Sequence, residues 1–311
     1  MPTFSDAVRT QTLLFDGGLG TALIAAGLDL SVEPPEAWLT SQPDCVRAVH
    51  RAFEHAGVDV LQTNSFGLLR LLRARQAPLV ADDALRQAQR LAERSVSLAY
   101  SDRRPPWIVA SLGPSGPPPV ATQTAAIADH CEALAQAFQT AGADALHLET
   151  ACDPGDLAAM LDGAARPGLP LAVSMTVSLG QSGMETPLGV PLARMLKVLE
   201  FAAVRPVLVG VNCSLPARRL RRAVSELADW AAGQRGERPR VLVQPQVDEP
   251  APDCKRPPQP ESPERFASDL LQLLSDGADH LGGCCGCRPE HMAAVARLLR
   301  PAPAPSATDP E

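Results

Sequence analysis

The sequence predicts an α/β protein in which eight parallel strands and eight helices form a single-domain (β/α)8 TIM barrel. Short apolar or β-branched runs recur roughly every 30 to 40 residues, and each is followed by a longer segment rich in Ala, Leu, Arg and Glu. Polar and sulfur-containing side chains follow these runs at their carboxyl ends. The length of 311 residues suits this fold, because such barrels exceed ~200 residues as one domain.

The first half of the chain contains four of the runs. The expected strands are residues 12–15, 58–66, 107–111 and 145–150, and the expected helices between them are residues 43–56, 81–100 and 125–141. Residues 115–119 form a proline-rich break. Residues 1–11 are polar and lack the apolar stretch of a signal peptide.

The second half repeats the alternation. Pro154 follows Asp153 and indicates a helix start, because proline at an early helical position removes no hydrogen bond. The expected strands are 171–177, 207–211, 241–244 and 279–283, the further helices 192–203, 216–232, 262–276 and 289–299, and the long loops 178–189 and 245–260. We expect the barrel to span residues 1–300 and residues 301–311 to form a disordered tail.

Charge and hydropathy exclude several partners. The net charge of −7 gives no electrostatic footprint for nucleic acid or an anionic membrane. The arginines in residues 68–75 and 218–222 are spaced by leucine and alanine, as on solvated helix faces. No run approaches the ~20 apolar residues of a membrane span. We therefore expect a cytoplasmic protein whose cysteines are thiols.

The reactive side chains gather at one predicted face. Barrel enzymes build their sites at the carboxyl ends of the strands. An open, doubly wound sheet is the alternative fold, but it would spread these ends along a line. In a closed barrel the first and last strands are neighbours, so the residues at strand ends converge: Asp16, Asn64, Glu149, Cys213, Gln244, Cys284 and Cys285.

Three of the eight cysteines form the candidate metal site. Cys284 and Cys285 can bind one ion only if the backbone turns, and the glycines beside them permit that turn. With Cys213 they offer three thiolates, which suit zinc and leave its fourth position open, as in catalytic sites. Cys287 is the candidate fourth ligand of a closed structural site instead. The remaining four read as small buried or incidental residues: Cys45, Cys131, Cys152 and Cys254.

On these motifs the chain resembles the homocysteine S-methyltransferase family. That family includes the homocysteine domain of cobalamin-dependent methionine synthase, S-methylmethionine-dependent enzymes and betaine-homocysteine methyltransferases. The matching elements are Asp16-Gly17-Gly18-Leu19-Gly20-Thr21, Thr63-Asn64-Ser65-Phe66, Glu149-Thr150, Ser174-Met175-Thr176, Gly210-Val211-Asn212-Cys213-Ser214, Gln244-Pro245 and Gly282-Gly283-Cys284-Cys285-Gly286.

The resemblance implies that Cys213, Cys284 and Cys285 hold Zn²⁺ and carry catalysis, with the sulfur of homocysteine in the open position. A free thiol with a pKa near ~8.5 is mostly protonated at neutral pH, whereas a metal-bound thiol is deprotonated. The resemblance also implies that Asp16 and Glu149 bind the substrate's ammonium group, with Thr63 available to the substrate.

Two site residues have other readings. Asp16 is alternatively a turn residue bonded to the backbone of Gly17 and Gly18. His147 shares the face of Glu149 and reads as a satisfied core histidine.

The chain departs from the family in two places. Residues 246–248 are Gln-Val-Asp where the methionine synthase type has Asn-Ala-Gly, so the resting fourth ligand is open. Thr150 replaces the tyrosine of betaine enzymes, and the one tyrosine, Tyr100, falls on an expected helix. A tyrosine cage for a quaternary ammonium is therefore not expected.

The expected reaction is methyl transfer from a small donor, S-methylmethionine or S-adenosylmethionine, to homocysteine, giving methionine. Two alternatives remain. The methyl group comes from a separately encoded corrinoid protein, or the chain is a zinc-thiolate protein that binds thiols without turnover. The loops 178–189 and 245–260 are expected to frame the donor site.

Overall fold

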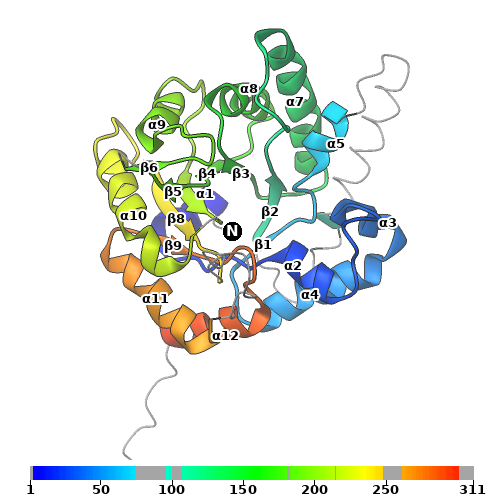
Figure 1. The fold of residues 1–311 in the computed structure, drawn as a ribbon, viewed down its shortest axis with the longest axis vertical. Coiled ribbons are helices and arrows are strands. Elements are labelled where there is room, and N and C mark those ends of the chain that lie inside the picture. The colour runs from blue at the N-terminus through cyan, green and yellow to red at the C-terminus, as the bar shows by residue number, and fades with distance from the viewer. Residues whose placement is uncertain are drawn as a thin grey trace, which may run out of the picture.

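The protein contains a curled parallel sheet surrounded by helices (Figure 1). The computed structural model describes residues 3–74, 96–97, 99, 107–180, 183–213, 215–247 and 261–300. Seven strands of the sheet pair in parallel in the order β1-β2-β3-β4-β7-β8-β9. Their bounds are β1 (Val60–Gln62), β2 (Trp107–Leu112), β3 (Ala145–Ala151), β4 (Leu171–Met175), β7 (Leu208–Asn212), β8 (Arg240–Gln244) and β9 (His280–Leu281).

The helices follow the strands in the expected alternation. Their bounds are α4 (Pro43–His55), α5 (Leu68–Ala74), α7 (Thr124–Thr140), α8 (Pro154–Ala165), α9 (Leu192–Glu200), α10 (Ala217–Ala232), α11 (Pro263–Ser275) and α12 (Pro289–Leu299). Asp153 caps α8 by accepting a hydrogen bond from the Asp156 amide, and Ser262 caps α11 in the same way. Among the described residues, no helix has both the length and the apolar character needed to cross a membrane.

Short elements were not expected from the sequence. These are α1 (Phe4–Thr10), α2 (Leu19–Ala25), η1 (Pro35–Ala37), α3 (Trp38–Ser41), η2 (Ala121–Gln123) and an antiparallel hairpin, β5 (Ser178–Leu179) with β6 (Met184–Glu185), inside the expected loop 178–189. The tail 301–311, Cys254, Tyr100 and most of the expected helix 81–100 and loop 245–260 lie outside the described residues.

The first expected strand, residues 12–15, forms isolated bridges instead of a regular strand. Leu14 bridges Leu281 of β9, and Phe15 bridges Val60 of β1, both in parallel. The Phe15 amide donates to the Leu281 carbonyl at 2.7 Å, and the Asp59 amide donates to the Leu14 carbonyl at 2.7 Å. This segment therefore contacts both edges of the seven-stranded sheet, and the sheet is barrel-like.

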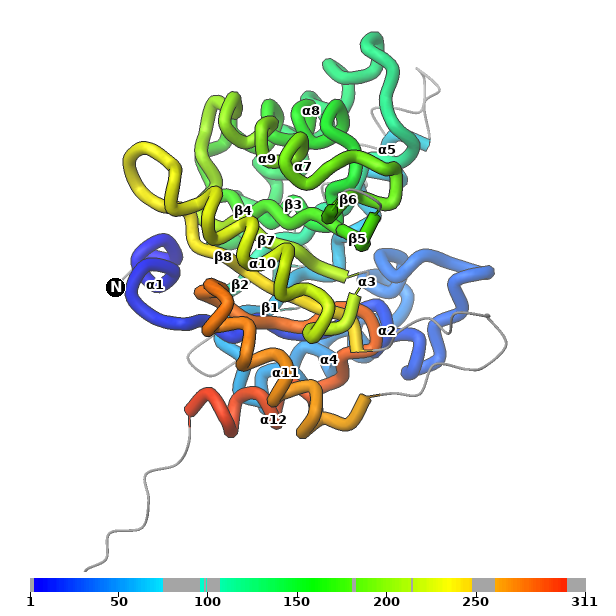
Figure 2. Tube along the Cα trace, turned by 60° about the vertical axis from the view of Figure 1, so that its left-hand side comes forward, coloured from blue at the N-terminus to red at the C-terminus, as the bar shows by residue number. Residues whose placement is uncertain are grey.

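An apolar layer fills the interior at the amino ends of the strands. Six strands of the sheet, β1 to β4, β7 and β8, each contribute one buried residue to it, and the bridging segment contributes two: Leu13, Phe15, Val60, Val109, Ala145, Ala172, Leu208 and Leu242. Phe4 and Val8 of α1 are buried in the same cluster, and the Phe4 ring packs edge to face on Trp107 at 5.8 Å. Figure 2 shows α1 at one end of the sheet and α2 and α3 at the other. Helix α1 therefore covers the amino end of the interior.

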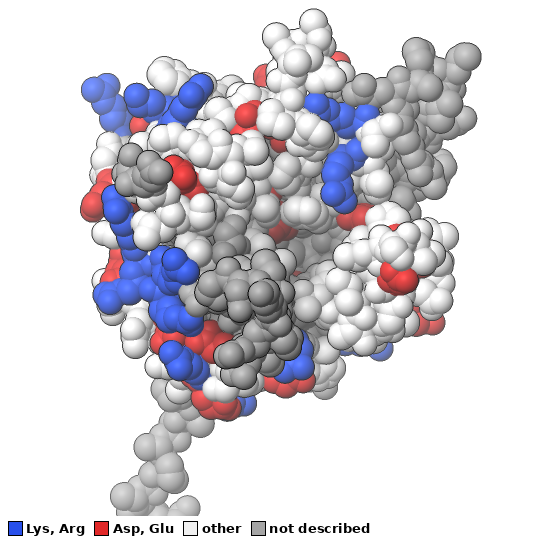
Figure 3. Space-filling view, viewed as in Figure 1, with Lys and Arg blue, Asp and Glu red and all other residues white. Residues whose placement is uncertain are grey.

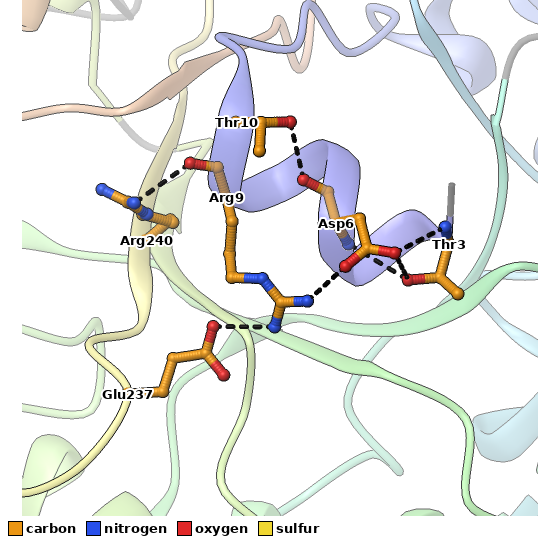
Figure 4. Close-up of polar contacts among 6 residues, drawn as sticks. All are labelled: Thr3, Asp6, Arg9, Thr10, Glu237 and Arg240. Carbon is orange, nitrogen blue, oxygen red and sulfur yellow. Dashed lines mark hydrogen bonds and ion pairs between the residues drawn. The ribbon is translucent and has the colours of Figure 1, made fainter. Parts of the chain in front are cut away.

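Polar contacts fasten α1 in this place (Figure 4). Thr3 and Asp6 form a capping box at its first turn. Arg9 forms ion pairs with Asp6 and with Glu237, at 2.8 Å for the latter, and Arg240 donates to the Arg9 carbonyl at 3.1 Å. Exposed pairs of this kind contribute little each, so the apolar burial of Phe4 and Val8 accounts for most of the attachment.

A polar layer lies above the apolar one, toward the carboxyl ends. Side chains two residues further along a strand point to the same face, and here they are buried polar groups: Gln62, Ser111, His147, Ser174 and Gln244. Glu149 and Asn212 lie one further step along β3 and β7. The interior therefore changes from apolar to polar toward one end.

Candidate active site

Three thiols meet at the carboxyl end of the sheet. The Sγ atoms of Cys213, Cys284 and Cys285 all lie within 4.8 Å of one another, and those of Cys213 and Cys285 are 3.4 Å apart. Cys213 directly follows β7, and the other two follow β9. The convergence expected from the sequence is therefore present.

The pKa values of two of these thiols are raised. Hydrogen bonding with Cys213 raises the pKa of Cys285 to about 11. Hydrogen bonds with Cys213 and Cys285, together with burial, raise the pKa of Cys284 well above its ordinary value. Three soft donors that mutually oppose ionisation fit a borderline-soft divalent ion such as zinc, which would neutralise the thiolates.

Backbone geometry places Cys213 among the other thiols. Its φ of 60° lies in the left-handed region, which is uncommon for a residue with a side chain. Its amide donates to the Gln244 carbonyl at 2.9 Å, and its carbonyl accepts from the Leu215 amide at 2.7 Å. These bonds hold a turn at the end of β7.

The glycines of the cysteine loop combine one left-handed position with two positions of close packing. Only Gly286 has a left-handed φ, of 77°. A Cβ on Gly282 would lie 2.8 Å from the Phe15 Cβ, and one on Gly283 would lie 2.2 Å from the Cys287 Sγ. Gly286 therefore has the backbone conformation that favours glycine, and Gly282 and Gly283 leave room for neighbouring side chains.

The first glycine motif packs directly on the cysteine loop. A Cβ on Gly17 would lie 2.7 Å from the Cys287 carbonyl oxygen, and one on Gly18 would lie 2.6 Å from the Cys284 carbonyl oxygen. The Gly18 amide donates to the Cys287 carbonyl at 2.9 Å. The Asp-Gly-Gly element therefore fixes the loop that carries the thiols, because only glycine permits this approach.

Cys287 does not join the thiol cluster. It is fully buried, and its Sγ lies 3.2 Å from the Met292 Sδ. The group of possible metal ligands found among the described residues consists of Cys213, Cys284 and Cys285. The alternative of a closed four-cysteine site is therefore not supported by the geometry.

The cysteines expected to be incidental lie apart from this cluster as far as they are described. Cys131 is buried, and its thiol donates to the Met160 carbonyl at 3.3 Å. Cys45 and Cys152 are half-buried and belong to no group of possible metal ligands among the described residues.

Glu149 lies below the thiols and is surrounded by neutral donors. Its Oε1 accepts hydrogen bonds from the Ser111 hydroxyl and from Gln62 Nε2, the latter at 3.1 Å. Its Oε2 accepts from Asn212 Nδ2 at 3.1 Å. Burial, and secondarily the proximity of Cys213, raise the pKa of Glu149 to about 7. The carboxyl group is therefore suited to an incoming cation.

Asp16 is the second acid of the site. It is fully buried, and its Oδ2 accepts a hydrogen bond from the backbone amide of Gln62 at 2.9 Å. Its Oδ1 has no partner among the described residues. Burial raises its pKa well above the ordinary value, and Glu149 raises it further. The alternative reading of Asp16 as a turn residue bonded to Gly17 and Gly18 is not what these contacts show. A buried acceptor without a donor is costly, and an ammonium group would satisfy it.

Thr63 and Asn64 hold the loop that follows β1. The Thr63 hydroxyl lies 2.5 Å from the Ser65 hydroxyl and accepts from the Ser111 amide at 3.1 Å. Asn64 Nδ2 donates to the Pro35 carbonyl at 2.8 Å. Both side chains therefore have structural partners.

His147 is a satisfied core histidine, as expected. Its Nε2 lies 2.8 Å from the Ser174 hydroxyl, and its Nδ1 lies 3.1 Å from Gln62 Nε2. Burial lowers the pKa of His147 to about 3, so it stays neutral at physiological pH.

Sequence reasoning did not identify three of the residues that surround Glu149. Ser111 and Gln62 belong to the polar layer, and Asn212 was noted only as part of the motif before Cys213. Strand alternation was the available signal, because residues at i and i+2 share a face. The pairing of Ser111 with His147 supplies the register that alternation alone lacks.

The sequence and the fold both match known proteins. A model of the homocysteine S-methyltransferase family matches residues 13–299. The chain is 28% identical over 95% of its length to the methionine synthase of Mycobacterium tuberculosis, and 26% identical over 94% to that of Mycobacterium leprae. It covers 26% and 25% of these two relatives, so it spans about a quarter of their length.

Solved structures show the same fold. The metallated form of the homocysteine methyltransferase MmuM from Escherichia coli superposes with a TM-score of 0.70 at 21% identity, covering 93% of this chain and 97% of that one. Its oxidised form gives a TM-score of 0.68 at 21% identity, with 93% and 96% covered. Because the family model extends over nearly the whole chain, this chain belongs to the homocysteine S-methyltransferase family.

Proposed function

We propose that the chain transfers a methyl group to the thiol of homocysteine, giving methionine, with Zn²⁺ held by Cys213, Cys284 and Cys285. The observation that carries the proposal is the position of three converging thiols above two acids, the buried Asp16 and the half-buried Glu149, that have only neutral partners. A thiol amino acid presents a sulfur to the first group and an ammonium to the second.

The three thiols would bind the metal through their Sγ atoms. Bound there, zinc would supply a deprotonated substrate sulfur at neutral pH. The Escherichia coli relative is described as a metallated form, which supports a metal in this fold. Thiols that are to bind a metal must stay reduced, as thiols do in the cytosol, which supports the cytoplasmic location expected from the sequence.

The acids of this chain would bind the amino group. Glu149 and Asp16 would accept hydrogen bonds from the ammonium, and the unpartnered Asp16 Oδ1 is available for one of them. A bound cation favours ionised carboxylates, so it would lower their raised pKa values. Because the Thr63 hydroxyl already has two partners, its role in substrate binding stays a prediction.

The closed barrel is part of the proposal. We propose that residues 1–300 form one (β/α)8 domain, in which residues 13–15 act as the strand between β9 and β1, and that residues 301–311 form a tail. Hydrogen bonds from this segment to both edges of the sheet support the closure.

A small sulfonium compound is the proposed donor, and a separate corrinoid protein is the second candidate. One observation favours the second. Several large apolar side chains are exposed in the connections that follow the strands' carboxyl ends: Ile24, Leu30, Val32, Phe66, Val120, Leu179 and Leu188. Figure 3, which looks onto this face, shows a central hollow with mostly uncharged residues along its upper and right sides. Exposed apolar surface around a site suits a macromolecular partner.

Product formation tests the proposal. The zinc-loaded protein is incubated with homocysteine and, in parallel, with S-methylmethionine, S-adenosylmethionine, betaine or methylcobalamin, and methionine is measured. Cys285→Ala is the inactive variant, and Cys45→Ala is the matched control. Methionine from a sulfonium compound supports the first candidate, and turnover only with methylcobalamin supports the second. Bound homocysteine without turnover on any donor would favour the thiol-binding alternative.

A further inference from the structure

Asn212 connects two strands that do not pair with each other. It is the last residue of β7 and is 1% exposed. Its side chain reaches the end of β3, although β4 lies between these strands in the sheet. The contact therefore crosses the interior near the site instead of following the ladder.

The carboxamide group uses both of its ends. Its Oδ1 accepts from the Thr150 amide at 2.9 Å. Its Nδ2 lies 2.9 Å from the Thr150 hydroxyl, 3.1 Å from Glu149 Oε2 and 3.9 Å from the Cys284 Sγ. One nitrogen thus contacts an acid of the proposed ammonium site and a thiol of the proposed metal site.

The backbone around Asn212 is held in an uncommon conformation on both sides. Thr150 and Cys213 have φ values of 62° and 60°, and they are the non-glycine residues in the left-handed region among those described. Asn212 forms two hydrogen bonds with Thr150 and directly precedes Cys213 in the chain. Strained residues persist where the surroundings fix them, and Asn212 supplies that restraint.

We propose that Asn212 is a positioning residue that sets the spacing between the ammonium site at Glu149 and the thiol cluster, and thereby makes the site select homocysteine over cysteine. This inference rests on the proposed function. Homocysteine and cysteine carry the same thiol, ammonium and carboxylate groups, and homocysteine has one more methylene between the thiol and the α-carbon. A fixed spacing is therefore the property that separates them.

Binding measurements on matched variants test this role. Asn212→Ala removes all four contacts, and Asn212→Asp keeps the size but replaces the donor facing Glu149 by an acceptor. Ser174→Ala is the control, because Ser174 is buried in the neighbouring strand and contacts His147 instead of the site. Calorimetry gives the affinities of the zinc-loaded proteins for homocysteine and for cysteine, and zinc content and thermal unfolding are measured alongside.

Both Asn212 variants are expected to keep zinc, to bind homocysteine about 10- to 100-fold more weakly, and to lose about 10-fold in preference over cysteine. Ser174→Ala is expected to keep the preference. An unchanged preference in folded, zinc-loaded Asn212 variants would overturn the inference, and so would a loss of zinc in parallel with affinity. The binding measurement needs no turnover, so it can be made even if the protein methylates nothing. A wild-type protein that binds homocysteine selectively without methylating it would refute the proposed methyl transfer, and the role of Asn212 in selectivity could still be tested.

Discussion

The Sγ atoms of Cys213 and Cys285 lie 3.4 Å apart, although 72 positions separate the two residues in the chain. The first thiol reaches the cluster through a left-handed turn at the end of β7, and the second through a loop that packs on Gly17 and Gly18. The proposed metal site thus depends on two separately built turns, which makes each thiol individually testable.

Removal of any one thiol of the cluster should abolish stable metal binding. Cys213→Ala, Cys284→Ala and Cys285→Ala each leave two thiolates, fewer than the three protein ligands usual for a catalytic zinc. We expect bound zinc to fall from about one ion per chain to well below one after dialysis, measured by atomic absorption. Cys45→Ala should retain the metal. Full zinc in Cys213→Ala would contradict the assignment.

Cys287→Ala should retain zinc, because its sulfur faces Met292 and not the cluster. The cost should appear in stability instead, since the substitution removes a fully buried sulfur from the core. We expect the free energy of unfolding to fall by about 1 to 2 kcal/mol. Metal analysis and urea unfolding of the same preparation separate the two effects, and loss of zinc would revive the four-cysteine site.

Homocysteine binding should strengthen as the pH rises through about 7, where burial places the pKa of Glu149. Above this pH the carboxylate is ionised before the ammonium arrives, whereas below it a proton must be released. Glu149→Gln should reduce the dependence to the part that comes from release of the substrate's thiol proton, and it should weaken binding about 10- to 100-fold, as expected for a lost charge-assisted bond. Calorimetry between pH 6 and pH 8 measures both effects.

The Glu149 carboxyl group should also make the free energy of unfolding depend on pH. The folded pKa of Glu149 lies above its ordinary value of 4.5, so the folded protein binds more protons than the unfolded chain between these values. Its contribution to the free energy of unfolding therefore decreases as the pH rises from about 4.5 to about 7. Glu149→Gln should flatten this slope, and an unchanged slope would show that other groups cause it.

His50→Leu should stabilise the protein. His50 is 1% exposed on α4, and neither ring nitrogen has a hydrogen-bond partner among the described residues. We expect a gain of about 1 to 2 kcal/mol at neutral pH, because an unsatisfied buried polar group is replaced by an apolar one. The exposed His55→Leu on the same helix should change the free energy by less than about 0.5 kcal/mol.

The buried His50 should also reduce the stability of the protein at acid pH. Burial lowers its pKa from 6.5 to about 4, so the unfolded chain binds the extra proton between these values and stability decreases as the pH falls through them. His50→Leu should reduce this loss. Thermal unfolding from pH 4 to pH 7 measures it, and an equal loss in both proteins would exclude His50 as a cause.

Gly163→Ala should destabilise the contact between α7 and α8. An added Cβ would lie 2.1 Å from the Ala128 carbonyl oxygen and 3.0 Å from the Cys131 Cβ. We expect a loss of about 1 to 3 kcal/mol from overpacking. Gly20→Ala in α2 is the matched control: among the described residues, no atom outside its own helix backbone and chain neighbours lies within 4 Å of the added Cβ, and the helix should gain up to about 1 kcal/mol. Equal effects at the two positions would contradict this packing.

The sequence was sufficient for the elements that carry a strong pattern. The expected runs 107–111, 145–150 and 241–244 correspond to β2, β3 and β8, and the expected helix 289–299 has the bounds of α12. The short elements α1, α2 and α3 were missed because seven or fewer residues give little hydrophobic periodicity. The hairpin β5–β6 was missed because two-residue strands resemble a loop.

For the candidate site, the positions of the residues along the strands were predictable, but the directions and partners of their side chains were not. Residues at strand ends indicated where Cys213 and Glu149 lie, because parallel strands end at one face. Side-chain direction was not predictable where it depends on packing: Cys287 faces away because Gly283 and Met292 enclose its sulfur. The donors to Glu149 depend on the register between strands, which a single sequence does not fix.

The contact between residues 13–15 and β9 bears on the order of folding. The Leu13 amide donates to His280 Nδ1 across a separation of 267 positions, and contacts of such long range form slowly. Asp16 and Cys284 lie directly beyond this junction. A nascent chain on the ribosome can assemble neighbouring strands and helices early, but the thiol pair cannot meet Asp16 until the final strand has emerged. On the proposed function, metal capture and substrate recognition therefore begin only after translation has passed the last of the proposed ligands.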